Sequence, residues 1–549
     1  MTRLSLPLAL ATSLALAACA TVPAEAPVAI SQDTLQRVTR TLSDDSFEGR
    51  APGTAGEEKT LAFLVEQFAA AGLTPGNEGS WFQDVPLVEI TATNPRPLTV
   101  AGQSFTYGSD WIGATYREVP RTDLADSEIV FVGFGIVAPE KGWNDYAGID
   151  MRGKIALILV NDPDYAEETT IGPFNGRAMT YYGRWTYKYE EAARQGAAAA
   201  LIVHEDFPAS YGWATVESSW SGPQVYAQRA DGGADQTQMN GWVQKRVAEA
   251  IVRAGGRDFA QLAAAARQSG FRPVPLGVTG STGFDNAIRR FASKNVVGIL
   301  PGRTRPDEYV LHTAHWDHLG RCTPNAAGDD ICNGAIDNAT GTAALVALAE
   351  AHRQAGPTAR TQVFLAVTAE ESGLLGSEYY GANPVFPLAQ TVGGVNMDAL
   401  SLAGPARDLT VVGGGKSELD AFLDRALAEQ GRTITPDPSP QAGYYYRSDH
   451  FPLAKRGVPM FYVKGGQDLV EGGRAAGQAW DAAYRASAYH QPDDEYDPAW
   501  DWRGTLQDVM LYYRLGRMLG ESTAWPKWLP GDEFRAVRDA SCAADAGGC

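Results

Sequence analysis

The stretch Val363-Phe-Leu-Ala-Val-Thr-Ala-Glu370-Glu371 joins an apolar, partly β-branched run directly to two carboxylates. Residues 309–314 and 391–397 are similar runs, and they are followed by His315 and Asp398. Short apolar runs of this kind predict buried strands of a parallel sheet. The carboxyl ends of parallel strands meet at one edge of the sheet, where binding sites form. We therefore predict an α/β fold, with a mostly parallel central sheet flanked by helices and a functional site at that edge.

The polar residues around these strand ends are of the types that bind zinc-like ions. A bridged pair of such ions needs about five imidazole and carboxylate ligands, with one carboxylate shared. The chain supplies His315, Asp337, Glu371, Asp398 and His490, with Glu370 beside them. Alone, a His-x-Asp step is usually a turn feature, and adjacent glutamates usually begin a solvated helix. Their joint occurrence predicts a two-metal hydrolase site.

The composition bounds the class of protein. With 549 residues, 44% of them hydrophobic, the chain is long enough for two folded domains with large cores. Its formal net charge of -19 and its 46 dispersed Lys and Arg residues argue against a nucleic-acid partner, which would require a basic face.

Residues 1–18 have the features of a signal peptide: Arg3, then an apolar stretch, then small residues before Cys19. The apolar stretch is too short for a transmembrane helix. The ending Leu16-Ala-Ala-Cys19 resembles the lipobox of bacterial lipoproteins, in which the cysteine becomes the lipidated first residue. We expect an exported protein that is anchored through Cys19 to the cell envelope, at the outer membrane facing the periplasm, with residues 19–30 as a tether. Plain secretion after cleavage nearby is the alternative.

The other four cysteines are even in number, which suits disulfides in an exported chain. Short-range pairing predicts one bond between Cys322 and Cys332 and another between Cys542 and Cys549. A cysteine metal site is the alternative, but neither pair has the CxxC spacing that would favour it.

A second unit is expected over residues 126–291, without a cluster of ligand-type residues. The predicted strands are 128–137, 154–160 and 198–204, and the predicted helices are 187–195, 241–254 and 259–266. The segments that resemble a protease-associated (PA) domain are 131–137, 153–160 and 190–203. Such a β-rich insertion would form a lid or wall over the site. It would divide the catalytic domain into residues 31–125 and 292–525, with a tail over 526–549.

Five motifs carry a resemblance to a known family. In the expected order, the chain resembles the co-catalytic zinc aminopeptidases of peptidase family M28 in His315-Trp-Asp317, Gly334-Ala-Ile-Asp337-Asn-Ala-Thr-Gly341, Glu370-Glu-Ser-Gly-Leu-Leu-Gly-Ser377, Asn396-Met-Asp398 and Tyr489-His490. The segment Ser46-Phe-Glu-Gly-Arg50-Ala-Pro-Gly-Thr-Ala-Gly56 also resembles an N-terminal segment of that family. The resemblance implies the zinc aminopeptidase fold, peptide substrates and two zinc ions.

The resemblance also implies a role for each metal-site residue. The two ion sites that it carries over are His315 with Asp398 and Glu371 with His490, bridged by Asp337. Asp317 would accept a hydrogen bond from the other ring nitrogen of His315 and so fix the tautomer. His312 and His318 are expected to be neighbours in the fold and not ligands.

The implied chemistry is hydrolysis by a metal-bridging hydroxide, with Glu370 as the general base that later returns the proton to the leaving amine. Tyr489 or one of residues 444–446 would donate a hydrogen bond to the developing oxyanion, although adjacent tyrosines are more often a packed cluster. Arg447 matches a family position near the substrate, and an ion pair with Asp449 is the alternative.

The fold alone does not fix the reaction. The leading hypothesis is a metallo-aminopeptidase that releases N-terminal residues from peptides. A carboxypeptidase or dipeptidase of the same fold would need a basic pocket, for which Arg447 and Lys464 are candidates. A glutaminyl cyclase would use one zinc ion, and a receptor-like binding protein would not need the intact ligand set. Two segments depart from the family pattern and leave the substrate open, 321–332 and 465–488.

Replacement of Cys19 by serine removes the thiol that a lipid anchor requires. We expect Cys19→Ser protein to leave the membrane fraction when cells are fractionated and immunoblotted. The matched control Ala20→Ser keeps the thiol and should stay with the membranes. Unchanged membrane association of the Cys19→Ser protein would reject the lipobox interpretation.

Overall fold

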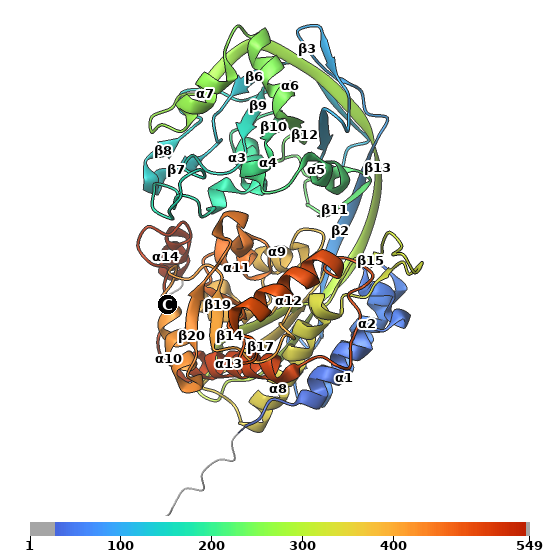
Figure 1. Cartoon of the computed structure of the whole chain (residues 1–549), viewed down its shortest axis with the longest axis vertical. Helices are drawn as coiled ribbons and strands as arrows, with labels where there is room; N and C mark the ends of the chain where they lie inside the picture. The colour runs from blue at the N-terminus through green and yellow to red at the C-terminus, as the bar shows by residue number, and fades with distance from the viewer. Residues whose placement is uncertain (1–27, 545–549) are drawn as a thin grey trace, which may run out of the picture.

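The computed structural model describes residues 28–544, which form two lobes joined by two long strands (Figure 1). Strands β2 (Phe82–Thr93) and β13 (Val274–Leu300) run antiparallel, from Phe82 opposite Val296 to Thr93 opposite Asp285. We call residues 98–284 the insert lobe and the remainder the site lobe. The signal peptide, Cys19 and most of the tether lie outside the described residues and stay predictions.

The central sheet of the site lobe has a parallel core. Its four adjacent parallel strands, in spatial order, are β17 (Arg360–Val367), β14 (Arg305–His315), β18 (Thr391–Asn396) and β21 (Met460–Gly465). The end of β13 pairs antiparallel with β17 at one side. At the other side lie β19 (Asp408–Val411), antiparallel to β21, and β20 (Thr433–Pro436). The expected α/β fold with a mostly parallel sheet is confirmed.

Helices cover both faces of this sheet, and strand β17 is therefore buried along its whole length. Phe364 and Ala366 pack into one core, and Val363 and Leu365 pack into another on the opposite face. The helices on the first side include α1 (Gln32–Leu42), α2 (Ala55–Ala70), α8 (Thr340–Gln354), α10 (Asp420–Gln430) and α13 (Trp502–Glu521). Those on the second are α9 (Leu375–Ala382) and α11 (His450–Lys455).

The insert lobe has a smaller sheet of its own. Its adjacent parallel strands are β6 (Arg121–Phe131), β9 (Ile155–Leu159), β10 (Ala199–His204) and β12 (Met239–Gln244). Strand β5 (Trp111–Ala114) pairs antiparallel with β12, so residues 111–114 join this sheet although they precede the boundary expected at residue 126. The helices of this lobe include α3 (Trp185–Arg194), α6 (Lys245–Ala254) and α7 (Phe259–Ala266).

One helix of the insert lobe begins later than predicted. A helix was expected from residue 241, but residues 239–244 form β12 and α6 begins at Lys245. Residues 239–243 are fully buried between β10 and β5, and this pairing overrides the local helical pattern.

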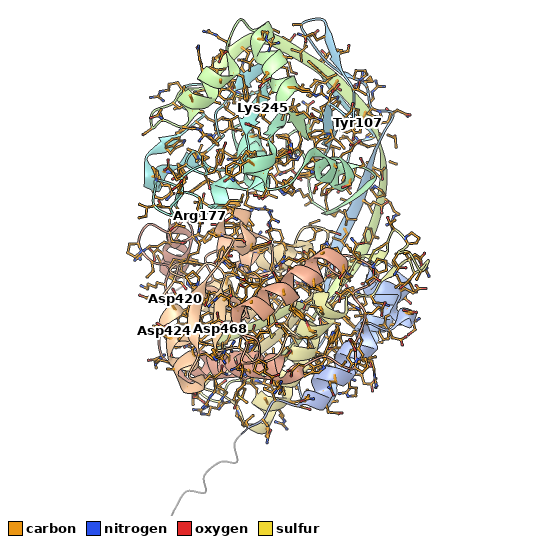
Figure 2. The ribbon with its side chains drawn as sticks, viewed as in Figure 1. Tyr107, Arg177, Lys245, Asp420, Asp424 and Asp468 are labelled. Atoms are coloured by element: carbon orange, nitrogen blue, oxygen red, sulfur yellow. A yellow bond between two sulfur atoms is a disulfide. The ribbon has the colours of Figure 1, made fainter. Side chains whose placement is uncertain are left out.

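The lobes meet at a cavity of about 870 Å³ that residues of both line. Arg177 lies on the edge of the insert lobe that faces the site lobe, and Asp420 and Asp424 lie on the opposite wall (Figure 2). The insertion thus lines this cavity together with residues 411–533, and its role as a lid or wall over the site stays a prediction.

The loop that departs from the family pattern is closed by the expected disulfide between Cys322 and Cys332. Its ends form a two-stranded ribbon, β15 (Gly320–Arg321) with β16 (Ile331–Cys332). The bond between Cys542 and Cys549 stays a prediction because Cys549 lies outside the described residues. None of the helices within residues 28–544 is both long and apolar enough to cross a bilayer.

Candidate metal centre

The predicted site residues come together at the carboxyl edge of the parallel strands. His315 is the last residue of β14, Glu370 and Glu371 follow the end of β17, and Asp398 follows the end of β18. Asp337 lies in the turn Ala335–Ala339 that precedes α8, and His490 follows α12 (Gly473–Ser487).

Asp337 lies between two histidines and presents one carboxylate oxygen to each. Its Oδ1 is 3.3 Å from Nε2 of His315, and its Oδ2 is 3.3 Å from Nε2 of His490. The same nitrogen of His315 is 3.5 Å from Oδ1 of Asp398, and that of His490 is 3.2 Å from Oε2 of Glu371. These neighbours divide into the two pairs that the family resemblance implied, with Asp337 in common.

The residues present fit divalent ions. Nε2 of His315 is buried and makes no hydrogen bond within the described residues, although Asp337 and Asp398 oxygens lie nearby. A ring nitrogen and carboxylate oxygens that face a common point without hydrogen bonding have the arrangement of a metal-ligand set. The groups whose ligand atoms lie within 4.8 Å of one another are His315, Asp337 and Asp398; His318, Asp337 and Glu371; and His315, Glu370 and Glu371.

The charges of the cluster shift the pKa values of His315, His490 and Asp337. Burial alone would lower the pKa of His315, but the carboxylates around it, Glu370 first, raise it well above its usual value. Hydrogen bonds to Asp337 and Glu371 likewise outweigh burial and raise the pKa of His490 to about 10. In return, and against burial, the histidines hold the pKa of Asp337 well below its usual value.

Asp317 supports the site in a way that differs from the prediction. Nδ1 of His315 lies 3.1 Å from the backbone carbonyl oxygen of Asp317, and the carboxylate is farther away, at 3.8 Å. The carboxylate instead accepts a hydrogen bond of 3.1 Å from the backbone N–H of Glu370. The prediction that the carboxylate of Asp317 accepts this hydrogen bond was therefore wrong. The chain turns after His315 and presents the backbone carbonyl of Asp317 to the ring instead.

His318 is a site residue that the sequence analysis did not place in the cluster. Its Nδ1 is 2.6 Å from Oε1 of Glu371, and its ring packs edge-on against His490. The spacing His315-x-x-His318 was the available signal, but a histidine after a strand end has no fixed direction. Contact with Glu371 orients that carboxylate toward Asp337.

Asp494 and Asn338 fix the backbone on either side of Asp337. The carboxylate of Asp494 accepts hydrogen bonds from the N–H groups of Ile336 and Asp337, at 3.0 and 3.1 Å. The side chain of Asn338 donates to the carbonyl of Met397, directly before Asp398, at 2.9 Å. These bonds join the turn of one candidate ligand to that of another, and the sequence analysis found neither.

Arg50 joins the segments that carry the candidate ligands. Its buried guanidinium donates to the backbone carbonyls of Leu42, Trp316, Asn333 and Gly334, at 2.6 to 3.0 Å. Burial lowers its pKa to about 10, while nearby carboxylates, Asp317 first, oppose the shift. The motif at residues 46–56 was noted in the sequence, but its role as a clamp follows only from the fold.

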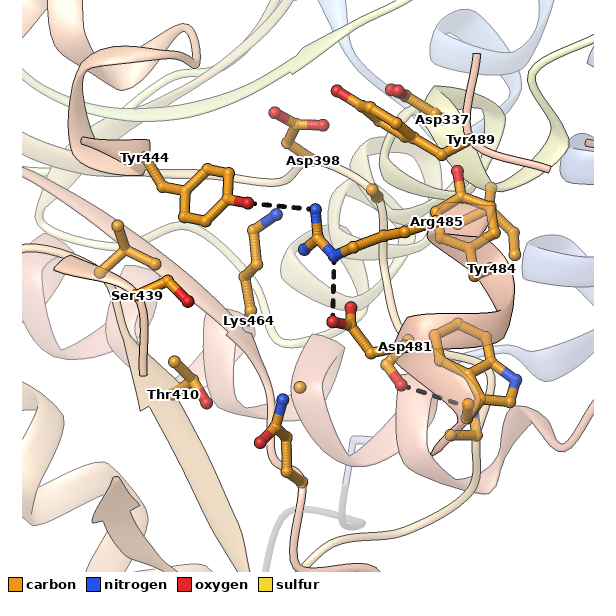
Figure 3. Close-up of a pocket in the computed structure, with 18 of the residues that line it drawn as sticks. Asp337, Asp398, Thr410, Ser439, Tyr444, Lys464, Asp481, Tyr484, Arg485 and Tyr489 are labelled. Carbon is orange, nitrogen blue, oxygen red and sulfur yellow. Dashed lines mark hydrogen bonds and ion pairs between the residues drawn. The ribbon is translucent and has the colours of Figure 1, made fainter. Parts of the chain in front are cut away.

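A cavity of about 280 Å³ opens beside the cluster and is lined by Asp337, Glu370, Asp398 and His490 (Figure 3). Tyr489 and Tyr444 also line it, whereas Tyr445 and Tyr446 are buried outside it. The ring of Tyr489 stacks on His490, with 3.9 Å between centroids.

Arg447 lies in the wall of the same cavity and does not pair with Asp449. Its guanidinium lies 5.6 Å from the ring centroid of Tyr444, and it forms no ion pair within residues 28–544. Asp449 accepts a hydrogen bond of 2.6 Å from Ser377 instead. The structure thus leaves Arg447 available to the cavity.

A parallel α/β sheet with imidazole and carboxylate groups at its carboxyl edge is typical of metal-dependent hydrolases. Residues 295–514 match the model of peptidase family M28. No curated protein matches the sequence.

Several solved structures are similar to the chain. One is an aminopeptidase from Aneurinibacillus sp. strain AM-1, at 18% identity and a TM-score of 0.48, covering 90% of this chain and 95% of that one. Another is a zinc aminopeptidase from Bacillus subtilis, at 18% identity and 0.41, covering 92% and 100%. A third is a peptidase M28 precursor from Shewanella amazonensis SB2B, at 16% identity and 0.37, covering 91% and 99%.

Replacing Arg50 by methionine leaves four buried carbonyls without their donor. Because each unsatisfied group costs about 1–3 kcal/mol, we expect the free energy of unfolding to fall by at least about 3 kcal/mol. Urea denaturation followed by circular dichroism measures the change. Arg40→Met, at an exposed position of α1, is the matched control and should change stability by less than about 0.5 kcal/mol. Equal stability of the two variants would contradict the clamp.

Proposed function

We propose that this peptidase is a zinc-dependent aminopeptidase that releases N-terminal residues from peptides. The observation that carries the proposal is the position of Asp337, whose two oxygens face His315 on one side and His490 on the other. A carboxylate shared in this way suits a bridge between two ions. The family match supports action on peptide bonds.

Two zinc ions would be held on either side of Asp337. The residues on one side are His315 and Asp398, and those on the other are Glu371 and His490. Bound there, zinc would lower the pKa of water toward neutrality and polarise the substrate carbonyl. Ser448, whose Oγ donates to Oδ2 of Asp398 at 2.5 Å, orients that carboxylate from behind.

Glu370 is placed to move the proton. It lines the cavity, and its pKa is raised well above the usual value, by burial first and then by the neighbouring carboxylates. A carboxylate with raised proton affinity takes the proton of an attacking water and returns it to the leaving amine. The hydrogen bond from the backbone N–H of Glu370 to the carboxylate of Asp317 fixes the position of Glu370 relative to the cluster.

Tyr489 is the tyrosine we assign to the developing oxyanion. It lines the cavity, and its ring stacks on that of His490. Tyr446 is excluded because its hydroxyl donates to Glu533 at 3.0 Å. Tyr444 also lines the cavity, where cationic side chains surround it.

We further propose export and anchoring through Cys19, which rests on the lipobox-like sequence. A tether would hold the site lobe away from the membrane and open to peptides of the periplasm.

Cleavage specificity is read from products. The protein without residues 1–18 is incubated with zinc and a mixture of peptides whose termini are free or blocked, and products are identified by mass spectrometry. We expect stepwise loss of residues from free N-termini and no cleavage of N-acetylated peptides. Loss from C-termini would transfer the assignment to a carboxypeptidase.

Glu370→Gln separates a proton carrier from a metal ligand. We expect kcat/KM to fall by at least about a hundredfold, since general-base catalysis contributes about 10² to 10⁴. Zinc content, measured by plasma mass spectrometry, should stay near two ions per chain in this variant. Asp337→Ala is the comparison variant and should lose zinc and activity together. Parallel loss of zinc from Glu370→Gln would refute the base assignment, and one ion per chain in the wild type would favour a glutaminyl cyclase.

A further inference from the structure

Three cationic side chains surround one tyrosine in the cavity beside the metal centre. The charged groups of Arg485, Arg447 and Lys464 lie 5.4, 5.6 and 5.8 Å from the ring centroid of Tyr444. They come from different elements: Arg485 from α12, Lys464 from β21, and Arg447 from the turn before α11. Figure 3 shows Lys464 and Arg485 pointing toward the hydroxyl end of Tyr444.

The carboxylates near these three cations do not balance their positive charge. Arg485 is paired with Asp481 at 3.0 Å. Asp437 lines the same cavity, where burial raises its pKa and Lys464 and Arg485 only partly oppose the shift. Neither Arg447 nor Lys464 forms an ion pair with a carboxylate in the described part of the chain. Three cations thus share two carboxylates, one of which is disfavoured in its charged form.

The insert lobe adds a further positive charge that interacts with Arg447. Arg184 precedes α3, is 8% exposed, and makes neither an ion pair nor a side-chain hydrogen bond among the described residues. Burial first, and then repulsion by Arg447, lower its pKa to about 9. Positive side chains that are held near one another without partners mark a site for an anion.

We infer that the cavity binds a carboxylate of the substrate through Lys464 and Arg447, on either side of Tyr444. The inference rests on the proposed function and deepens it, because it names a substrate class: peptides with a carboxylate within one residue of the scissile bond. The hydroxyls of Thr410 and Ser439 line the same cavity and supply further donors. The carboxylate has two sources, the side chain of an N-terminal aspartate or glutamate and the free C-terminus of a dipeptide.

Pairs of substrates that differ only in this charge test the inference. Asp-Ala-Phe-amide against Asn-Ala-Phe-amide isolates the side-chain source, and Leu-Ala against Leu-Ala-amide isolates the C-terminal source. In at least one pair we expect kcat/KM of the wild type to be about tenfold or more higher for the carboxylate, because hydrogen bonds to a charged group are stronger than those to a neutral amide. The pair that shows the preference identifies the source.

Variants at residue 464 connect the preference to the cation. Lys464→Met should reduce the carboxylate-to-amide ratio of kcat/KM by about tenfold. Lys464→Arg retains the charge and should retain most of the ratio. Lys527→Met removes an exposed lysine elsewhere and is the matched control, with an unchanged ratio. Equal rates within both pairs in the wild type, or an unchanged ratio in Lys464→Met, would overturn the inference while leaving the peptidase assignment intact.

Failure of the proposed function has a different signature. If zinc-loaded wild type cleaves none of these peptides, the aminopeptidase proposal fails, and binding decides the inference separately. Isothermal titration calorimetry with glutamate against glutamine, and with alanine against alaninamide, should then show tighter binding of the carboxylate in one pair. The difference should vanish in Lys464→Met. Equal binding within both pairs would overturn the inference.

Discussion

The contact of Asp337 with two histidines is the interaction on which the site depends. One carboxylate contacts His315 and His490, which are far apart in sequence and belong to different elements. A buried carboxylate is costly unless it is paired and hydrogen-bonded. Its position therefore has to be fixed from every side, and much of the surrounding polar structure serves that end. Asp494 holds the backbone before the carboxylate, and Asn338 holds the backbone after it.

The sheet provides the rigid part of this arrangement. His315 ends one of three adjacent parallel strands, and Glu370 and Asp398 follow the other two. The spacing and register of these strands are set by backbone pairing. The other candidate ligands lie on turns outside the sheet. Hydrogen bonds from side chains to the backbone hold these turns, in place of the hydrogen bonds that pair strands in the sheet. Arg50 supplies several of these hydrogen bonds at once. The backbone carbonyls that accept them stabilise its buried guanidinium.

The sequence predicted what depends on short-range pattern. Apolar runs located the strands, and the polar residues directly after them located most of the cluster, because a strand end fixes where the next side chain lies. Contacts made through the backbone could not be found in this way: nothing in the sequence distinguishes Asp494 from Asp493, or indicates which carbonyls Arg50 binds. Segment 465–488 departs from the family pattern and was assigned no helix, yet residues 473–487 form α12, whose Gly- and Ala-rich composition gives a weak helical signal.

The helix α12 also shapes the cavity beside the metal centre. Its residues Trp480, Tyr484 and Arg485 form part of the cavity lining beside the sheet edge. At one end, the carboxylates Asp337, Glu370, Glu371 and Asp398 would formally balance the two zinc ions that we propose, so the cations of the other end would not be needed to neutralise them. The field of Arg447 and Lys464 is therefore directed at whatever enters the cavity. A substrate whose negative charge lies next to the bond to be cleaved gains from that field, whereas a positively charged residue at the same position is repelled.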